Sequence, residues 1–237
     1  MALFRLLDGV LTDLTGGLPH SQLAILPGTT HAKSGHAASV GYHDRGPDNQ
    51  EDAVTETAVR DAPNPTAFRM QQTYRWVGEV VADLSGEQLR WQPNPTTPSI
   101  RFHLFHIARW GDVLLQRLTG AGNQIWHAEG IAERWGFDPA ALGVGESGEM
   151  LDDETAMTLP LPERAVLFAY CDRVFGAVDQ ALAAVEDEEM RRPVTDSDGL
   201  SVLLGASIAG QLSHTARHLG MIECLRGMQG LRGTATD

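Results

Sequence analysis

The sequence predicts an all-α protein that folds as a four-helix bundle with one long crossover connection. Three observations lead to this fold class. Four long segments place apolar residues at helical spacing, no segment alternates apolar and polar residues, and one connection is much longer than the others. At 237 residues, of which 42% are hydrophobic, the chain is long enough for one substantial domain with an extension, or for two small domains.

The first two predicted helices lie on either side of a proline-rich connection. Asn64-Pro65-Thr66 is a helix start signal, and apolar residues at helical spacing continue from there to a break at Ser85-Gly86. No helix can cross the prolines of residues 91–98. Ser99 is then expected to cap a second helix, which runs from Ile100 to about Leu118.

The second half of the chain predicts three further helices. A shorter helix over residues 124–135 is followed by an irregular acidic connection as far as Leu161. Pro162 is well placed in the first turn of the next helix, which continues to about Glu186. The last long helix is expected over residues 203–225, and no strand is predicted.

The first 65 residues differ from the rest of the chain. From Thr15 to Pro65 the sequence is rich in Gly, Pro, Thr, Asp and His and has hardly any periodic apolar position. Such a segment cannot bury enough apolar surface to offset its conformational entropy. We therefore predict a disordered extension over residues 1–65 and a folded domain over residues 66–237.

Composition and charge argue against several classes of function. The net charge of −13 disfavours nucleic acid as a partner, because phosphate backbones are bound through clustered Lys and Arg. No apolar run approaches the roughly 20 residues that span a membrane, and residues 1–14 lack the features of a secretory signal. A cytoplasmic protein is therefore expected. Cys171 and Cys224 lie in helical patterns without a C-x-x-C spacing, so both are predicted to be small buried residues.

The last predicted helix contains the strongest chemical motif, His214 and His218 four residues apart in the segment Gln211 to Gly220. Residues at this spacing lie on one helical face, with roughly 5–6 Å between their Cβ atoms. Two imidazoles placed in this way can bind one divalent metal ion at about 2.0–2.1 Å. The same spacing also arises by chance in two partly buried histidines. A metal site therefore requires at least one ligand from elsewhere in the fold.

The second predicted helix offers that further ligand. His103 and His106 are three residues apart beside an apolar stripe, and either of them could face the histidine pair across a bundle. Three neutral histidines with an open position are typical of a catalytic metal site. The spacing alone does not decide between His103 and His106.

Three segments of the chain resemble the DinB-like superfamily, which also contains the mycothiol-dependent maleylpyruvate isomerases and the YfiT-type metal-dependent proteins. The segments are Ser-Ile-Arg-Phe-His-Leu-Phe-His-Ile-Ala-Arg-Trp from Ser99, Ile-Trp-His-Ala-Glu-Gly-Ile-Ala-Glu-Arg-Trp-Gly from Ile125, and His-Thr-Ala-Arg-His-Leu-Gly-Met-Ile-Glu-Cys-Leu-Arg-Gly from His214. The resemblance covers about residues 66–233. It implies a four-helix bundle in which His106, His214 and His218 bind a divalent metal ion, and both Zn²⁺ and Ni²⁺ suit imidazole ligands.

Other residues near these motifs have less specific interpretations. His103 matches the residue one turn before the family's ligand on this helix. The resemblance therefore implies that His103 contacts a metal ligand or lines the pocket and does not bind the metal itself. Gln211 either hydrogen-bonds a ligand or a metal-bound water, or is an exposed amide. Arg109 and Asp112 are expected to form a solvated or interhelical ion pair, and Trp110 is expected in the core.

Two functions are compatible with these features. The resemblance implies a metal-dependent thiol transferase or isomerase, in which the ion binds a low-molecular-weight thiol such as mycothiol and the thiolate attacks an electrophile. The alternative is a non-catalytic, stress-related bundle that binds a metal or a ligand. The expected partners are therefore a small thiol and an electrophilic small molecule. The sequence leaves open whether the chain forms a homodimer.

Overall fold

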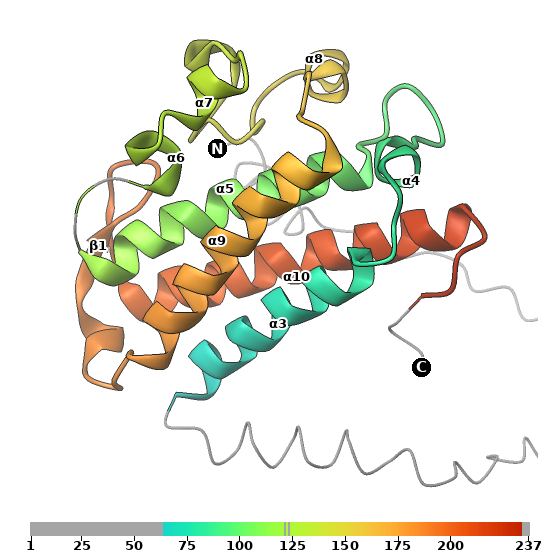
Figure 1. Cartoon of the computed structure of the whole chain (residues 1–237). Helices are drawn as coiled ribbons and strands as arrows, with labels where there is room; N and C mark the ends of the chain where they lie inside the picture. Colours follow the sequence, from blue (N-terminus) through green and yellow to red (C-terminus); the bar gives the residue numbers. More distant parts are fainter. Residues whose placement is uncertain (1–63, 121, 123, 234–237) are drawn as a thin grey trace, which may run out of the picture. The chain divides into compact units, whose positions relative to one another are not determined.

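The computed structural model describes residues 64–120, 122 and 124–233. The predicted extension, residues 1–65, lies outside the described residues apart from its last two. Four long helices form the bundle: α3 (Pro65–Val81), α5 (Ile100–Thr119), α9 (Arg164–Ala183) and α10 (Leu204–Met228). Helix α5 packs against α9 and α10, and α3 packs against the same two helices (Figure 1). The predicted all-α bundle is confirmed, and the connection from α5 to α9 is its long crossover.

The ends of the long helices follow from local signals in the sequence. Oδ1 of Asn64 accepts a hydrogen bond of 3.0 Å from the backbone amide three residues later, and this bond caps α3. Oγ of Ser99 accepts the equivalent hydrogen bond of 3.2 Å at the start of α5. Helix α5 ends at Gly120, whose φ of 64° lies in the left-handed region that glycine adopts readily. The starts of α3 and α5 agree with the predicted ones.

Short helices fill the connections. They are α4 (Gly86–Arg90), α6 (Ile125–Ala128), α7 (Ile131–Arg134), α8 (Asp153–Thr158) and the 3-10 helices η1 (Pro139–Ala141) and η2 (Glu189–Arg191). The single helix predicted over residues 124–135 is divided into α6 and α7 at Gly130, which has a φ of 58°. In the described part of the chain, no helix combines the length and the apolar character that a membrane crossing requires.

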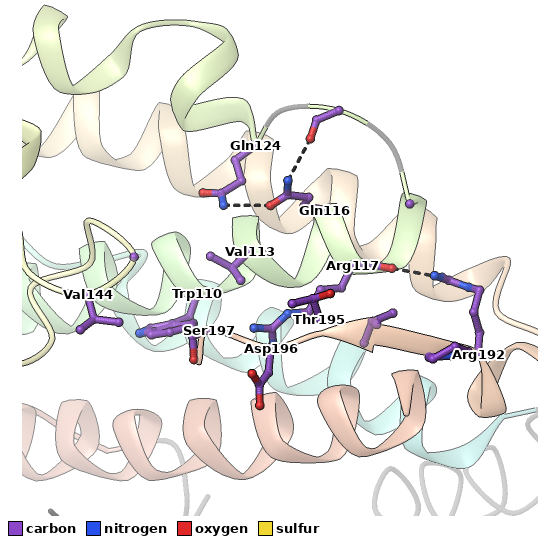
Figure 2. A pocket seen from close by; sticks show the side chains of 15 residues that line it. Trp110, Val113, Gln116, Arg117, Gln124, Val144, Arg192, Thr195, Asp196 and Ser197 are labelled. Carbon is purple, nitrogen blue, oxygen red and sulfur yellow. Dashed lines mark hydrogen bonds between the residues drawn. The ribbon is translucent and has the colours of Figure 1, made fainter. Parts of the chain in front are cut away.

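A small antiparallel hairpin precedes α10, so the prediction of no strands is wrong. Its strands are β1 (Pro193–Thr195) and β2 (Ser201–Leu203), with Val194 opposite Val202. Three residues are too few to show a period of two, and this explains why the pattern missed them. Just before the hairpin, Arg192 donates a hydrogen bond of 3.1 Å to the backbone carbonyl oxygen of Arg117 in the last turn of α5 (Figure 2). It donates a second one of 2.9 Å to the carbonyl oxygen of Leu118. The hairpin is therefore tied to the end of that helix.

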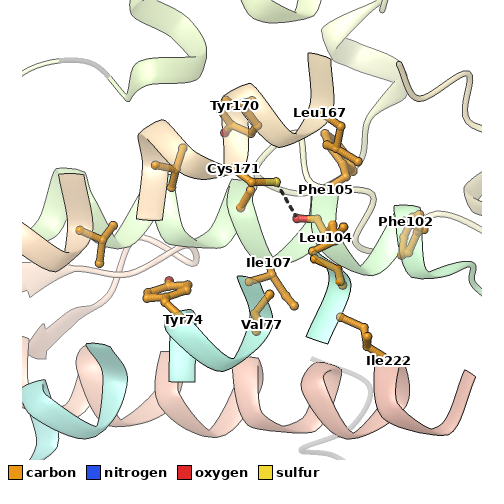
Figure 3. Close-up of a cluster of buried hydrophobic side chains, with 14 of the residues drawn as sticks. Tyr74, Val77, Phe102, Leu104, Phe105, Ile107, Leu167, Tyr170, Cys171 and Ile222 are labelled. Atoms are coloured by element: carbon orange, nitrogen blue, oxygen red, sulfur yellow. Dashed lines mark hydrogen bonds between the residues drawn. The ribbon is translucent and has the colours of Figure 1, made fainter. Parts of the chain in front are cut away.

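The core of the bundle lies between the four long helices. Val77 of α3, Ile107 of α5 and Ile222 of α10 lie there and are fully buried (Figure 3). Burying an apolar side chain of this size stabilises the fold by roughly 1.5–3 kcal/mol. Since Ile107 follows His106 directly and Ile222 lies one turn beyond His218, the histidines are placed at the edge of this core.

The two cysteines have different environments. Cys171 is buried, as predicted, and burial raises the pKa of its thiol. Cys224 is exposed on α10, so the prediction that it is buried is wrong. The exposed face of α10 also carries apolar residues such as Met221 and Met228. The helical pattern of this segment therefore does not separate core positions from surface positions.

Candidate metal centre

Two neighbouring helices bring four histidines together. His103 and His106 lie one turn apart on α5, while His214 and His218 lie one turn apart on α10. Helices α5 and α10 pack against each other, so the two pairs face one another across the bundle. His103 and His106 are 2% and 6% exposed, and the two residues of α10 are half-buried. Each histidine named by the sequence is thus part of one cluster.

Three ring nitrogens point at a common centre. Nε2 of His106 lies 3.0 Å from Nε2 of His214, and Nε2 of His218 lies 3.1 Å from the same atom. One ligand atom from each of the three residues falls within 4.8 Å of the others. A tetrahedral ion with metal–nitrogen bonds of about 2.0–2.1 Å separates its ligand nitrogens by about 3.3–3.4 Å. The two distances to Nε2 of His214 lie within a few tenths of an ångström of this separation, so the three residues could hold a divalent ion.

The hydrogen bond of His106 fixes which of its nitrogens is free for a metal. Its Nδ1 lies 2.9 Å from the backbone carbonyl oxygen of Ser147. A carbonyl oxygen only accepts, so Nδ1 carries the proton and donates. In the neutral ring, Nε2 then presents its lone pair to the centre. A carbonyl that orients an imidazole in this way is common in metal sites.

His103 contacts the cluster from behind. Its Nδ1 lies 2.9 Å from Nδ1 of His218, the ring nitrogen that does not face the centre. When Nδ1 of His218 donates to His103, the Nε2 atom of His218 keeps its lone pair for the centre. The geometry thus distinguishes the two histidines of α5. His106 belongs to the group formed with His214 and His218, whereas His103 contacts the far side of the His218 ring.

His214 contains a buried atom without a partner. Among the described residues, its Nδ1 has no hydrogen-bond partner, although its Nε2 contacts both other histidines. Buried polar atoms are paired in the great majority of cases, and exceptions concentrate at functional positions. Because Nε2 is the nitrogen that faces the centre, a metal ion there would leave this Nδ1 atom unpaired, and the atom does not bear on the metal site.

All four histidines have a lowered pKa. Burial, followed by the proximity of His106, lowers the pKa of His103 and of His214 to about 4 in each case. Burial and the three neighbouring histidines lower the pKa of His218 to about 2. Burial also lowers the pKa of His106, against the opposing effect of the Ser147 carbonyl. At neutral pH the rings are uncharged, which is the form that binds a metal ion.

Comparison with known proteins agrees with this arrangement. The sequence model of the DinB superfamily matches residues 69–222, a segment that contains all four histidines. The chain belongs to the DinB superfamily. A crystal structure described as the conserved protein of locus from Enterococcus faecalis has a similar fold, with a TM-score of 0.53 and 15% sequence identity over 68% of this chain and 92% of that chain. At this identity the likeness shows the fold alone. A search of curated proteins gives no significant match.

Two aromatic residues surround the histidines of this DinB-superfamily chain. Phe102 stacks on His106, with ring centroids 5.8 Å apart and an angle of 14° between the planes. Trp110 presents its ring edge-on to His106 and to His214, at centroid distances of 6.5 and 6.2 Å. Trp110 was expected in the core, but it is only half-buried. Aromatic walls of this kind restrict the access of water to a site.

The expectation that Arg109 and Asp112 form a solvated or interhelical pair is wrong. Both residues are completely buried and lie on the same helix, with Nη1 and Oδ2 3.2 Å apart. Asp112 also accepts hydrogen bonds of 2.9 and 2.8 Å from the first two backbone amides of α6. The pair therefore ties the start of the crossover to α5.

Arg109 also holds the loop that reaches His106. Its guanidinium donates to the backbone carbonyl oxygens of Gly145, at 2.9 Å, and Glu146, at 3.2 Å. The next residue along the chain is Ser147, whose carbonyl oxygen accepts from His106. The buried guanidinium of Arg109 thus fixes the crossover segment whose Ser147 carbonyl oxygen orients His106. His106 lies three residues before Arg109 on the same helix.

Gln211 makes a different contact from the one suggested by the sequence. Its side-chain amide donates to Oγ1 of Thr215 at 3.3 Å, one turn further along α10, and not to a histidine. Ser147 could not be found from the sequence. It acts through its main-chain carbonyl, which every residue type carries, so only the path of the crossover reveals it.

Proposed function

We propose that this protein binds one divalent metal ion through His106, His214 and His218, and uses it to bind and activate a small thiol. The observation that supports the metal site most directly is the convergence of three Nε2 atoms from two helices. The hydrogen bond from Nδ1 of His106 to the Ser147 carbonyl oxygen supports it further. Zn²⁺ and Ni²⁺ both suit three imidazole ligands, so we propose either as the natural metal.

Three protein ligands leave at least one coordination position for an exogenous molecule. When bound, the ion supplies a positive charge that favours the deprotonated form of a coordinated thiol, whose ordinary pKa is about 8.5. The three uncharged imidazoles do not neutralise that charge. Phe102 and Trp110 restrict the access of water beside the histidines. The thiol proton would pass to solvent, and the thiolate would form a bond to an electrophilic carbon of the substrate. In an S-transfer a leaving group would depart with the electrons of the bond that breaks, and in an isomerisation the thiol would be released again.

The thiol comes from solution in this proposal. Cys171 is buried in the core, and its raised pKa keeps it protonated. Cys224 is exposed on α10, whereas the candidate ligands on that helix are half-buried. Mycothiol is the proposed co-substrate, because the family resemblance extends to mycothiol-dependent isomerases.

The metal proposal is tested first by metal analysis of purified variants. Replacement of His106, His214 or His218 by Ala should each lower the metal content from one ion per chain to near zero. His127→Ala is the matched control, because His127 is a half-exposed histidine on α6 that pairs with Glu146 outside the centre. A full metal complement in His214→Ala would remove the proposed site.

The thiol proposal has its own spectroscopic test. Co²⁺-substituted protein is titrated with mycothiol and with 2-mercaptoethanol, and a thiolate-to-metal charge-transfer band should grow to saturation. The His214→Ala protein, treated in the same way, should show no band. If the wild-type spectrum does not change at millimolar thiol, the thiol-dependent activity is excluded.

One observation favours a second candidate, a non-catalytic metal-binding bundle. In the described part of the chain, the hydrogen bonds of the four histidines go to one another and to a backbone carbonyl, and none goes to a carboxylate. A proton-transfer reaction usually needs such a group within hydrogen-bond reach. Turnover of a thiol and an electrophile by the metal-loaded protein distinguishes the two candidates.

A further inference from the structure

A pocket of about 480 Å³ lies along the C-terminal half of α5 (Figure 2). It lies between the last turns of α5, the crossover around Gly145, and strand β1. Its walls are polar and apolar in equal measure, and side chains that line it include Trp110, Gln116, Arg117 and Gln124. A space of this size is within the range of small-molecule sites.

Trp110 borders both the pocket and the metal centre. This residue lines the pocket and also contacts the rings of His106 and His214 edge-on. His106, Trp110 and Arg117 follow one face of α5 at intervals of four and seven residues. At 1.5 Å per residue, His106 and Arg117 are about 16 Å apart along the helix axis. A small molecule that reaches both must be extended.

Two glutamine amides present hydrogen-bond donors to the pocket. Arg109 can only donate, and its bond of 2.8 Å to Oε1 of Gln124 therefore fixes the orientation of that amide. Nε2 of Gln124 then donates to Oε1 of Gln116 at 3.0 Å, and Nε2 of Gln116 donates to the carbonyl oxygen of Gly122 at 3.0 Å. Each amide nitrogen has a second N–H group, for which the described residues offer no hydrogen-bond partner.

Arg117 carries a positive charge that no adjacent carboxylate balances. Among the described residues, its hydrogen bond goes to the hydroxyl of Ser207 at 3.0 Å. Asp196, which also lines the pocket, attracts Arg117 only at longer range, and its Oδ1 accepts two backbone amides of its own turn. Partial burial disfavours the guanidinium charge, so an anion beside it would be stabilised.

Arg192, the second arginine of the pocket, has structural partners instead. It donates to two carbonyl oxygens at the end of α5 and to the carboxylate of Glu189 at 2.7 Å. Arg192 is therefore paired with a carboxylate, whereas Arg117 hydrogen-bonds only the hydroxyl of Ser207 among the described residues. Guanidinium and amide N–H groups together select oxygen acceptors, and a guanidinium fits a carboxylate or a phosphate.

We infer that this pocket binds an oxyanion group, a carboxylate or a phosphate, with Arg117 as its anchor and Gln116 and Gln124 as further donors. The inference rests on the proposed function in one respect: the anion belongs to the small molecule whose other end reaches the metal. The pocket thus selects extended organic anions and rejects neutral molecules of the same size.

The anion site is tested without any metal or thiol. Inorganic phosphate and, separately, succinate are titrated into metal-free ¹⁵N-labelled protein, and the indole N–H signal of Trp110 is followed after assignment with Trp110→Phe. The signal should shift to saturation with either anion. Arg117→Gln should raise the dissociation constant at least tenfold, and Arg117→Lys should recover part of the affinity.

The matched control is Arg75→Gln, which removes an exposed arginine of α3 that pairs with Asp179. It should bind both anions as the wild type does. Absence of a saturable shift in the wild type, or equal dissociation constants for the wild type and Arg117→Gln, would overturn the anion site. Because these titrations contain no metal, such a failure leaves the metal and thiol proposals to their own tests.

A second titration tests the link between the pocket and the metal. Co²⁺-substituted protein is titrated with glutathione, a thiol that carries two carboxylates, and with 2-mercaptoethanol, which carries none. Arg117→Gln should weaken the binding of glutathione about tenfold and leave that of 2-mercaptoethanol unchanged. If the variant weakens both thiols equally, or neither, the pocket does not serve the molecule bound at the metal.

Discussion

Nδ1 of His103 lies 2.9 Å from Nδ1 of His218, on the ring nitrogen opposite the one that faces His214. Because His103 contacts a candidate ligand and not the centre, its role is to orient His218. His103→Ala should therefore keep one metal ion per chain and weaken its affinity about 10–100-fold, the usual effect of removing a group behind a ligand. Competition with a chromophoric chelator measures this affinity. Complete loss of the metal, as expected for His214→Ala, would show that His103 is itself a ligand.

The metal should stabilise the fold measurably, since its candidate ligands join two helices. A ligand at about 100 times its dissociation constant adds about 2.7 kcal/mol to the free energy of unfolding. For a domain of this size, that corresponds to a rise in Tm of about 5–11 °C. Differential scanning calorimetry of the chelator-treated protein with and without Zn²⁺ measures this shift. His214→Ala protein should show no such shift, and an equal rise in this variant would place the ion elsewhere.

Arg109 and Asp112 should be among the most sensitive positions of the domain. Arg109→Met leaves the Asp112 carboxylate buried without its cation, and breaking a buried pair typically costs about 3–5 kcal/mol. Chemical denaturation measures the free energy of unfolding. The double variant Arg109→Met with Asp112→Asn should be more stable than Arg109→Met alone. A loss below about 1 kcal/mol in Arg109→Met, similar to that of an exposed arginine, would contradict the structural role of this pair.

Gly148 should not tolerate a side chain. It has a φ of +84°, and a Cβ atom there would lie 2.8 Å from Cε2 of Phe102. Gly148→Ala should therefore displace the crossover, reduce stability by about 1–3 kcal/mol, and weaken metal binding through the neighbouring Ser147. Gly78→Ala on α3 is the control, because no atom lies within 4 Å of the added carbon. That helical substitution should stabilise the protein by about 0.5–1 kcal/mol. Unchanged unfolding and metal affinity in Gly148→Ala would refute the prediction.

Removal of residues 1–63 should leave the bundle folded. This prediction comes from the lack of periodic apolar positions over most of the segment. The shortened protein should keep its helical circular dichroism, its cooperative unfolding and its metal content. Limited proteolysis of the full chain should give the same fragment. Loss of cooperative unfolding after truncation would show that the segment belongs to the folded domain.

Much of the fold follows from periodicity, because the bundle depends on apolar stripes that the sequence displays directly. Asn64, Ser99 and Gly120 mark helix ends through local rules that do not depend on the rest of the fold. The hairpin around Val194 escaped detection because each strand has three residues. Cys224 was misplaced because apolar residues also occupy the exposed face of α10.

The candidate site was only partly visible in the sequence. The spacing of His214 and His218 indicates a shared helical face, whereas His103 and His106 are equivalent until the packing of α5 on α10 is known. The burial of Arg109 depends on a crossover that folds back over its own helix, and such a path leaves no periodic pattern. Trp110 looked like a core residue because helical spacing does not show where the helix borders a pocket.

The contact between His106 and Ser147 has a consequence for sequence variation. The accepting atom belongs to the main chain, so substitutions at position 147 that preserve the backbone path keep the contact. Related chains could therefore differ freely at this position and still orient the imidazole in the same way. The constraint would appear instead at Gly148, where the backbone conformation excludes other residues, and at Arg109, which holds the neighbouring carbonyl oxygens. A comparison of residue types across related chains would therefore overlook position 147, although its carbonyl oxygen orients the imidazole of His106.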